Sequence, residues 1–393
     1  MEKPLEGNEQ GSNGRSAVKA AAKILVLFGT RPEAIKLAPV ILELKKATHF
    51  ETVVVSSGQH KEFLSPVLKV FEIEPDHDLE VMRENQTPNT VLADTVIKLD
   101  SLLESEAPDL ILVQGATSTA LAGALAGFNR DIAVGHIEAG LRTGDLRCPF
   151  PEEMNRRLIT QAATFHFAPT AQNRQNLLKE SVSDKQIFVT GNTVVDAIDI
   201  ARKKKPSGQV VKVLEMTEGK KRVVLTMHRR ESFRKRMREY LTEIGDFVER
   251  HEEVALIFPV HLNPAARKIA TDILAERNRI LLLEPLHYPD FLHLMENSWI
   301  ILTDSGGIID EAPSIGRPVL ILQAKTERAE AVMCGVARLA GAEPEPFREV
   351  LENTYFADSW INSVKPMQNP FGAGDSAKKI VEVLTGISRP AEV

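Results

Sequence analysis

The 393-residue chain has very little cysteine, with only Cys148 and Cys334 far apart in the sequence. Two distant cysteines exclude a disulfide framework and a thiolate zinc cluster, and their scarcity fits a reducing cytosol. The sequence also lacks any run of about 18 or more apolar residues, and residues 1–22 lack the apolar stretch that a signal peptide needs. We therefore expect a cytoplasmic protein that neither spans a membrane nor is secreted.

Basic residues are not in surplus either. Lys and Arg total 48 and Asp and Glu total 54, which gives a formal net charge of −6. Nucleic acids and anionic membranes bind proteins with excess positive charge, so neither is expected as a general partner. A hydrophobic content of 43% and a charged content of 26% are ordinary for a globular protein. At about 150 residues per domain, the length predicts two or three domains.

Short apolar runs alternate with longer amphipathic stretches from Lys23 onward, after a polar, Gly-rich segment that we expect to be a flexible tail over 1–22. The expected strands of a first series lie at 23–29, 52–58, 109–115, 132–140 and 165–170, and those of a second series at 222–228, 254–261, 279–285, 299–307 and 317–323. Continuous apolar runs are typical of parallel strands that helices cover on both faces. The pattern predicts an α/β protein with two doubly wound domains, whose ligand lies in the cleft at the carboxyl ends of the strands.

Polar residues follow most of the expected strands of the first series. Arg31 precedes a helix that starts at Pro32, and a helix N-terminus favours an anion beside it, although a solvated arginine in a capping turn is the alternative. Gln59 and His60 follow the next strand, and Glu138 follows a later one. Donors and acceptors at consecutive strand ends are hard to explain by structure alone, so we expect a binding site there.

The second series contains a Ser305-Gly306-Gly307 turn that opens a helix. Because glycine has no Cβ, a phosphate can approach this backbone closely, and Glu311, one turn further, is placed to reach ribose hydroxyls. The chain has neither the GxGxxG fingerprint of nicotinamide enzymes nor a GxxxxGK[ST] phosphate loop. These absences disfavour dehydrogenases and ATP-driven enzymes.

Histidine and arginine residues follow two further strands of the second series. His228 and Arg229 end one strand, and His261 ends the next. A cationic group beside a histidine neutralises a diphosphate, and the histidine can act as an acid or a base near neutral pH. A solvated surface arginine and a buried, hydrogen-bonded histidine ring are the alternatives.

Glu152 and Arg156 lie four residues apart after two prolines. This spacing allows a simple ion pair on one helical face. Alternatively, Glu152 and Glu138 supply acid and base chemistry, because neighbouring carboxyl groups have pKa values that are driven apart. The sequence carries no HExxH motif and no calcium loop, so we expect no metal.

Ordered motifs between about Ile24 and about Gly341 resemble the non-hydrolysing UDP-N-acetylglucosamine 2-epimerases. The motifs are FGTRPEAIKLAP (28–39), SGQH (57–60), VQGATST (113–119), GHIEAGLRTGD (135–145), PFPEEMNR (149–156), TGNTVVDA (190–197), MHRRES (227–232), FPVHLNP (258–264), LTDSGGIIDEAPSIGRPVL (302–320) and KTERAEAV (325–332). The resemblance implies two Rossmann-like domains in the GT-B arrangement and a homodimer. It places the N-terminal domain at 23–190 plus about 372–393, with the last helix crossing back, and the UDP-binding domain at 191–371.

The resemblance also implies a reaction without a cofactor. The family removes the proton on carbon 2 of the sugar and expels UDP, which gives 2-acetamidoglucal, and UDP then adds back to yield UDP-N-acetylmannosamine, which usually feeds cell-surface polysaccharide. Implied catalytic residues are Glu138, Glu152, Arg156 and His228. Implied substrate-binding residues are Arg31, Lys36, Arg229, His261, Phe291, Ser305, Gly306, Gly307, Glu311 and Arg328.

Two departures from the family stand out. Its strand-end aspartate is replaced by Ala116, and the loss of one acid or base group costs about a hundredfold to ten-thousandfold in rate. This indicates an engineered inactive variant or, given further differences such as Asp310 for glutamate, a diverged natural member.

The second departure concerns regulation. In bacterial members a second UDP-N-acetylglucosamine is an activator. Gln59 and His60 of that site are kept, but Glu62 and Asn85 depart from it, so we expect weak or absent activation.

Three other functions stay open from the sequence. A hydrolysing relative releases free N-acetylmannosamine and UDP. A GT-B glycosyltransferase shares the fold, although the motifs at 149–156 and 135–145 argue against it. A non-catalytic UDP-sugar-binding protein is consistent with Ala116.

Overall fold

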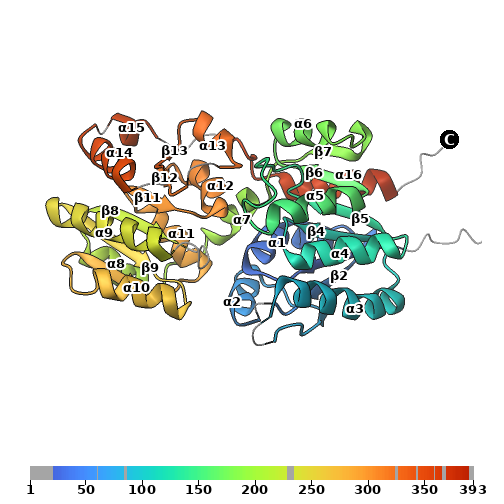
Figure 1. Cartoon of the computed structure of the whole chain (residues 1–393). Coiled ribbons are helices and arrows are strands. Elements are labelled where there is room, and N and C mark those ends of the chain that lie inside the picture. The colour runs from blue at the N-terminus through green and yellow to red at the C-terminus, as the bar shows by residue number, and fades with distance from the viewer. Residues whose placement is uncertain are drawn as a thin grey trace, which may run out of the picture.

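The computed structural model describes residues 21–59, 61–83, 86–227, 234–323, 326–341, 344–357, 359–364 and 369–388. Their fold consists of two parallel β-sheets, each with helices packed against it, which lie side by side (Figure 1). This arrangement confirms the α/β class predicted from the continuous apolar runs. The predicted tail, apart from its last two residues, lies outside the described part of the chain.

The first sheet has the strand order β3-β2-β1-β4-β5-β6-β7, and the second has the order β10-β9-β8-β11-β12-β13. The strands of the first sheet are β1 (Ala22–Phe28), β2 (Phe50–Ser56), β3 (His77–Asp78), β4 (Leu110–Gln114), β5 (Ala133–Ile137), β6 (Phe165–Ala168) and β7 (Ile187–Val189). Those of the second are β8 (Lys221–Thr226), β9 (Val254–Pro259), β10 (Ile280–Leu283), β11 (Ile300–Thr303), β12 (Val319–Ile321) and β13 (Ala337–Leu339). In both sheets the order reverses beside the first strand of the series, which is where doubly wound sheets bind ligands.

Helices connect the strands and cover the sheets. Up to β7 they are α1 (Arg31–Lys46), α2 (Lys61–Phe71), α3 (Pro88–Glu106), α4 (Ser118–Asn129), α5 (Glu152–Ala162) and α6 (Ala171–Lys179), followed by a short 3₁₀ turn, Asp184–Gln186. The remaining helices are α7 (Val194–Ala201), α8 (Gly208–Met216), α9 (Arg234–Arg250), α10 (Pro264–Leu274), α11 (Tyr288–Glu296), α12 (Gly306–Ile315), α13 (Ala329–Met333), α14 (Pro344–Phe356), α15 (Ser359–Ser363) and α16 (Ser376–Ser388). No helix among the described residues is long and apolar enough to cross a membrane.

Strand β1 shows why the runs are continuously apolar. Val26 and Phe28 belong to the core on the side of α1 and α2, whereas Leu25 and Leu27 belong to the core on the side of α3, α4 and α5. All four side chains are fully buried. The strand therefore has no solvent-facing side, and the next polar residue along the chain lies in the turn that follows Phe28.

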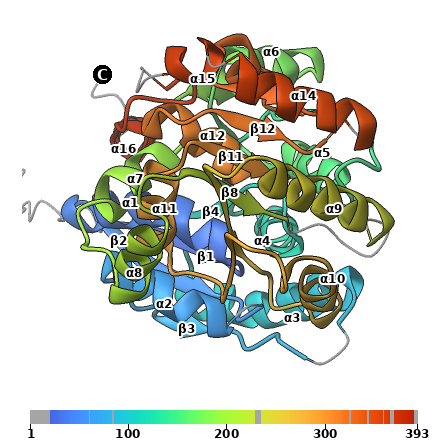
Figure 2. The ribbon, with the colours of Figure 1, turned by 90° about the vertical axis from the view of Figure 1, so that its left-hand side faces the viewer.

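The last helix returns to the first sheet, as the resemblance implied. Helix α16 packs against α1 and α7, and Figure 2 shows these three helices together. The buried carboxylate of Asp196, on α7, accepts hydrogen bonds from the backbone N–H groups of Ser376 (3.2 Å) and Ala377 (3.0 Å). It thereby satisfies donors that the first turn of α16 leaves unpaired.

Candidate active site

Two joined cavities lie where the carboxyl ends of the two sheets face each other. One has a volume of about 1030 Å³ and the other of about 480 Å³. Pro32 and Lys36 of α1 line both cavities, as do Ser305 and Gly307 at the start of α12. The two cavities therefore adjoin each other at these four residues.

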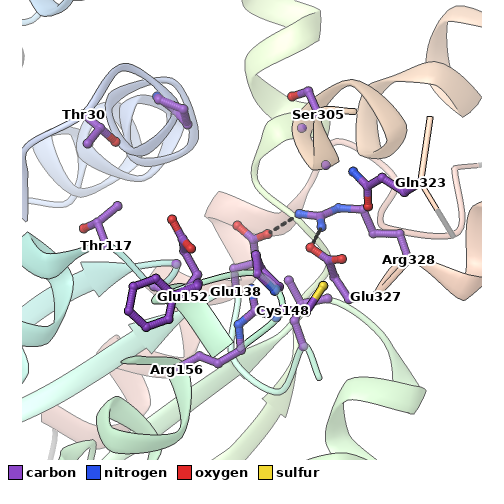
Figure 3. A pocket seen from close by; sticks show the side chains of 18 of the residues that line it. Thr30, Thr117, Glu138, Cys148, Glu152, Arg156, Ser305, Gln323, Glu327 and Arg328 are labelled. Carbon is purple, nitrogen blue, oxygen red and sulfur yellow. Dashed lines mark hydrogen bonds and ion pairs between the residues drawn. The ribbon is translucent and has the colours of Figure 1, made fainter. Parts of the chain in front are cut away.

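Glu138 is at the centre of a buried ion cluster in the larger cavity. Lys36 Nζ lies 2.5 Å from Glu138 Oε2 and 3.5 Å from Asp310 Oδ2. Arg328 Nη2 lies 3.3 Å from Glu138 Oε1, and Arg328 Nε lies 2.8 Å from Asp310 Oδ1. Figure 3 shows Glu138 and Arg328 pointing toward each other. Burial opposes the charge of Arg328, but the carboxylates of Asp310, Glu327 and Glu138 outweigh it and raise its pKa.

The backbone at Glu138 has φ +66°, in the left-handed region that non-glycine residues avoid. Its carboxylate also accepts a hydrogen bond from Gln114 Nε2, at the end of β4. Three donors thus hold this side chain, and they keep the residue in a conformation that costs of order 1–3 kcal/mol.

Glu33 holds two strand-end turns together. It is buried, and its Oε2 accepts from Gly29 N (3.1 Å), Thr30 N (2.8 Å) and Thr30 Oγ1 (2.7 Å). Its Oε1 accepts from Thr117 Oγ1 (2.6 Å), in the turn after β4. Burial raises the pKa of Glu33, and these hydrogen bonds partly oppose the rise. The turns that carry Thr30 and Ala116 are therefore fixed relative to each other.

The glycine turn at the start of α12 differs in part from the prediction. A Cβ at Gly306 would lie 2.3 Å from the guanidinium carbon of Arg328, so a larger residue here would displace the guanidinium from its ion pairs with Glu138 and Asp310. A Cβ at Gly307 would have Ser305 Oγ as its nearest neighbour, at 3.9 Å. Only Gly307 therefore leaves the open backbone that a phosphate needs.

The smaller cavity contains the predicted nucleotide-binding groups Arg31, His261, Phe291 and Glu311. Tyr288 Oη donates a hydrogen bond to Glu311 Oε1 over 3.1 Å. Burial raises the pKa of Glu311 to about 7, and burial lowers the pKa of Arg31. This cavity brings together an aromatic ring, a cation and a carboxyl group.

Of the two alternatives for Glu152 and Arg156, the simple ion pair is not formed. Arg156 Nη1 pairs instead with Glu153 Oε2 at 3.1 Å, three residues away, and Glu153 is fully buried. Arg156 is buried as well, which lowers its pKa. Among the described residues no hydrogen bond or ion pair reaches Glu152, whose side chain lines the larger cavity (Figure 3). Glu152 is thus a carboxyl group available to a substrate.

A third cavity, of about 500 Å³, adjoins the larger one. Thr30, Ala116, Thr117 and Glu152 line both of them. Gln59 lies in the third cavity, where its Oε1 accepts from a threonine hydroxyl of α4 over 3.0 Å. The small side chain of Ala116 therefore stands at the boundary between two spaces.

Several predicted residues lie outside the described part of the chain. They are His60, Asn85, His228 and Arg229, together with the side chain of Glu62. Of the side chains that are described, no group of three or more His, Cys, Asp or Glu is placed to hold a metal ion.

Four residues of the site were missed as site residues by the sequence analysis: Gln114, Glu33, Asp310 and Tyr288. Gln114, Glu33 and Asp310 lie in quoted motifs, and Tyr288 lies three residues before the predicted Phe291. Their position at a strand end or in the first two turns of a helix was the available signal. Their contacts depend on which side of the strand or helix faces the other sheet.

The chain matches the family described as "UDP-N-acetylglucosamine 2-epimerase" over residues 42–385. It is 42% identical to the UDP-N-acetylglucosamine 2-epimerase of Bacillus subtilis, over 92% of this chain and 94% of the relative. A Neisseria meningitidis UDP-GlcNAc 2-epimerase bound to UDP-GlcNAc has a similar structure, with a TM-score of 0.88 and 41% identity, over 93% of this chain and 100% of that one. An S. aureus protein solved with UDP has a TM-score of 0.89 and 36% identity, over 93% of this chain and 97% of that one.

The raised pKa of Glu311 predicts that its carboxyl group destabilises the fold at high pH. The folded state binds this proton more tightly than the unfolded state does, so stability falls as pH rises from the ordinary value of 4.5 to about 7. Glu311→Gln keeps an acceptor for Tyr288 but has no proton to lose. We expect the variant to match the wild type near pH 4.5 and to gain up to about 3 kcal/mol above pH 7.

Urea unfolding across this pH range measures the difference. Glu382→Gln, at an exposed position on α16, is the control and should show no such pH dependence. A constant stability difference between Glu311→Gln and the wild type at all pH values would contradict the prediction.

Proposed function

Because the chain belongs to the UDP-N-acetylglucosamine 2-epimerase family, we propose that it interconverts UDP-N-acetylglucosamine and UDP-N-acetylmannosamine. The observation that carries the proposal is the pair of joined cavities. One is suited to a nucleotide, and the other presents the carboxyl group of Glu152, which no described residue pairs, beside the charge cluster around Glu138. The substrate is a UDP-sugar, and no cofactor is required.

The smaller cavity accepts the uridine. Phe291 lies beside the base. Glu311 accepts hydrogen bonds from the ribose hydroxyls, because no cation in the described part of the chain lies within hydrogen-bond distance of its carboxyl group. Arg31 and the open N-terminus of α12 at Gly307 receive the diphosphate. Lys36, which lines both cavities, stands between the diphosphate and the sugar.

The larger cavity accepts the sugar. Glu152 removes the proton on carbon 2, because it is the carboxylate lining this space that the described residues leave unpaired. UDP leaves as the carbon–oxygen bond to carbon 1 breaks, which gives 2-acetamidoglucal. UDP then adds back, and a proton returns to the opposite face of carbon 2. His228, Arg229 and Arg156 complete the proposed catalytic and phosphate-binding set.

Deuterium exchange tests this reaction. Incubation of the protein with UDP-N-acetylglucosamine in D₂O should give deuterium at carbon 2 of both epimers, as seen by NMR. Glu152→Gln should slow the exchange by about a hundredfold to ten-thousandfold, because one acid or base group is lost. Glu43→Gln, which removes a carboxyl group from the surface of α1, is the matched control.

The time course also separates the other candidates. Release of free N-acetylmannosamine would indicate the hydrolysing reaction. Tight binding without any exchange would indicate a non-catalytic UDP-sugar-binding protein, which the replacement of the family aspartate by Ala116 favours. Either outcome would contradict the proposed epimerisation.

Ala116→Asp is expected to increase the exchange rate. The side chain at position 116 lines the same cavity as Glu152. An aspartate there restores the acid or base group of the family, and one such group typically raises the reaction rate about a hundredfold or more. The rate of deuterium incorporation at saturating substrate measures the gain. If the rate stays at the wild-type value, Ala116 does not limit the activity.

We also expect activation by a second substrate molecule to be weak or absent. The third cavity keeps Gln59, but its amide oxygen is occupied by a threonine hydroxyl, and Glu62 and Asn85 depart from the family. Initial rates should therefore depend hyperbolically on the UDP-N-acetylglucosamine concentration. A sigmoidal dependence would contradict this expectation.

The same proposal includes a cytoplasmic homodimer whose product, UDP-N-acetylmannosamine, is used to make cell-surface polysaccharide. Helices α3, α4 and α5 pack side by side and expose the apolar side chains of Ile97, Phe128, Met154 and Leu158, which is a suitable surface for a second copy. Both cysteines are free, in keeping with a reducing compartment. Sedimentation of the purified chain tests the dimer, and cell fractionation tests the location.

A further inference from the structure

Gln114 is the buried last residue of β4, and its side chain lines the larger cavity. Its amide contacts Glu138, which is also paired with Lys36 and Arg328. A carboxylate in ion pairs with two cations accepts hydrogen bonds and does not donate them. The amide nitrogen of Gln114 must therefore face Glu138, and this fixes the orientation of the whole amide group.

The orientation leaves the carbonyl oxygen Oε1 of Gln114 on the other side. Among the described residues no donor reaches this oxygen, and it is not one of the enclosed polar atoms that lack a partner. Because Gln114 lines the cavity, Oε1 is accessible from that space. Hydrogen-bond donation to a carboxylate also polarises the amide and makes its oxygen a better acceptor.

The other residues at this strand end offer no competing acceptor on a side chain. Ala116 has none. Thr117 Oγ1 donates to Glu33 over 2.6 Å and accepts from Ala120 N over 3.0 Å. The free acceptor that the end of β4 presents to the cavity is thus the carbonyl oxygen of Gln114.

We propose that Gln114 is a specificity-determining residue that holds Glu138 with its amide N–H and binds a donor on the sugar with its carbonyl oxygen. The donor is the acetamido N–H or a hydroxyl group next to the reacting carbon. The inference rests on the proposed substrate class, a UDP-linked 2-acetamido sugar.

Calorimetric binding of UDP and of UDP-N-acetylglucosamine tests the proposal without requiring turnover. Gln114→Met has a similar length and removes both hydrogen bonds. It should weaken binding of UDP-N-acetylglucosamine about fivefold to tenfold and leave binding of UDP within about twofold, because the nucleotide is held in the other cavity. Gln172→Met, at an exposed position on α6, is the matched control and should change neither affinity.

Gln114→Glu separates the proposed role from a structural one. It keeps an acceptor but places a second carboxyl group beside Glu138, and two such groups share a proton at low pH and repel each other when both are ionised. The affinity for UDP-N-acetylglucosamine, relative to that for UDP, should therefore fall with rising pH in Gln114→Glu. It should not do so in the wild type or in Gln114→Met. In the active enzyme, Gln114→Met should raise KM about fivefold to tenfold with a smaller decrease in kcat.

Equal loss of affinity for UDP and UDP-N-acetylglucosamine in Gln114→Met would overturn the proposal, because it would indicate a general structural role. An unchanged ratio of affinities would overturn it as well. A wild type that binds the UDP-sugar but exchanges no deuterium would instead overturn the proposed reaction and leave the role of Gln114 in binding intact.

Discussion

The site depends on one buried interaction, the pairing of Glu138 with Lys36 and Arg328. Glu138 and Lys36 belong to the first sheet and its helices, and Arg328 and its partner Asp310 belong to the second. Removing one member of a buried ion cluster leaves an uncompensated charge, which costs about 3–5 kcal/mol. The cluster therefore stabilises the approach of the two sheets that creates the joined cavities.

Other features of the site follow from this cluster. Glycine at position 306 lets Arg328 reach its ion pairs, because the guanidinium occupies the space of a Cβ. Glu138 can keep its left-handed backbone because three donors fix its carboxylate. Glu33 fixes the two neighbouring turns in the same way, with four hydrogen bonds to one carboxylate. The costly backbone conformation of Glu138 is thus maintained by side-chain contacts, of which the one from Arg328 crosses the cleft, whereas the contacts of Glu33 stay within the first sheet's turns.

The apolar runs predicted the two parallel sheets because strands buried on both faces leave a clear sequence pattern. Short or weakly patterned elements such as β3, α7 and α15 left no such pattern and were not predicted. Strand ends also predicted that Arg31, Glu138 and Glu311 meet in one cleft. The sequence could not show that Arg156 pairs with Glu153, since spacings of three and four both fit one helical face. Nor could it show the orientation of Gln114, which depends on charges contributed by both sheets.

Lys36 lines both cavities, and in the proposed reaction it therefore lies between the sugar and the leaving UDP. Its ammonium group has three donors, of which Glu138 and Asp310 take two. No described residue takes the third, and Lys36 lines both cavities together with Gly307 at the N-terminus of α12. As the bond to UDP breaks, negative charge grows on the departing phosphate oxygen, and preorganised donors stabilise charge at the point where it develops. An ammonium group already held by two carboxylates needs no reorganisation to do this, so in the proposed reaction the cluster that joins the sheets would also assist departure of the leaving group.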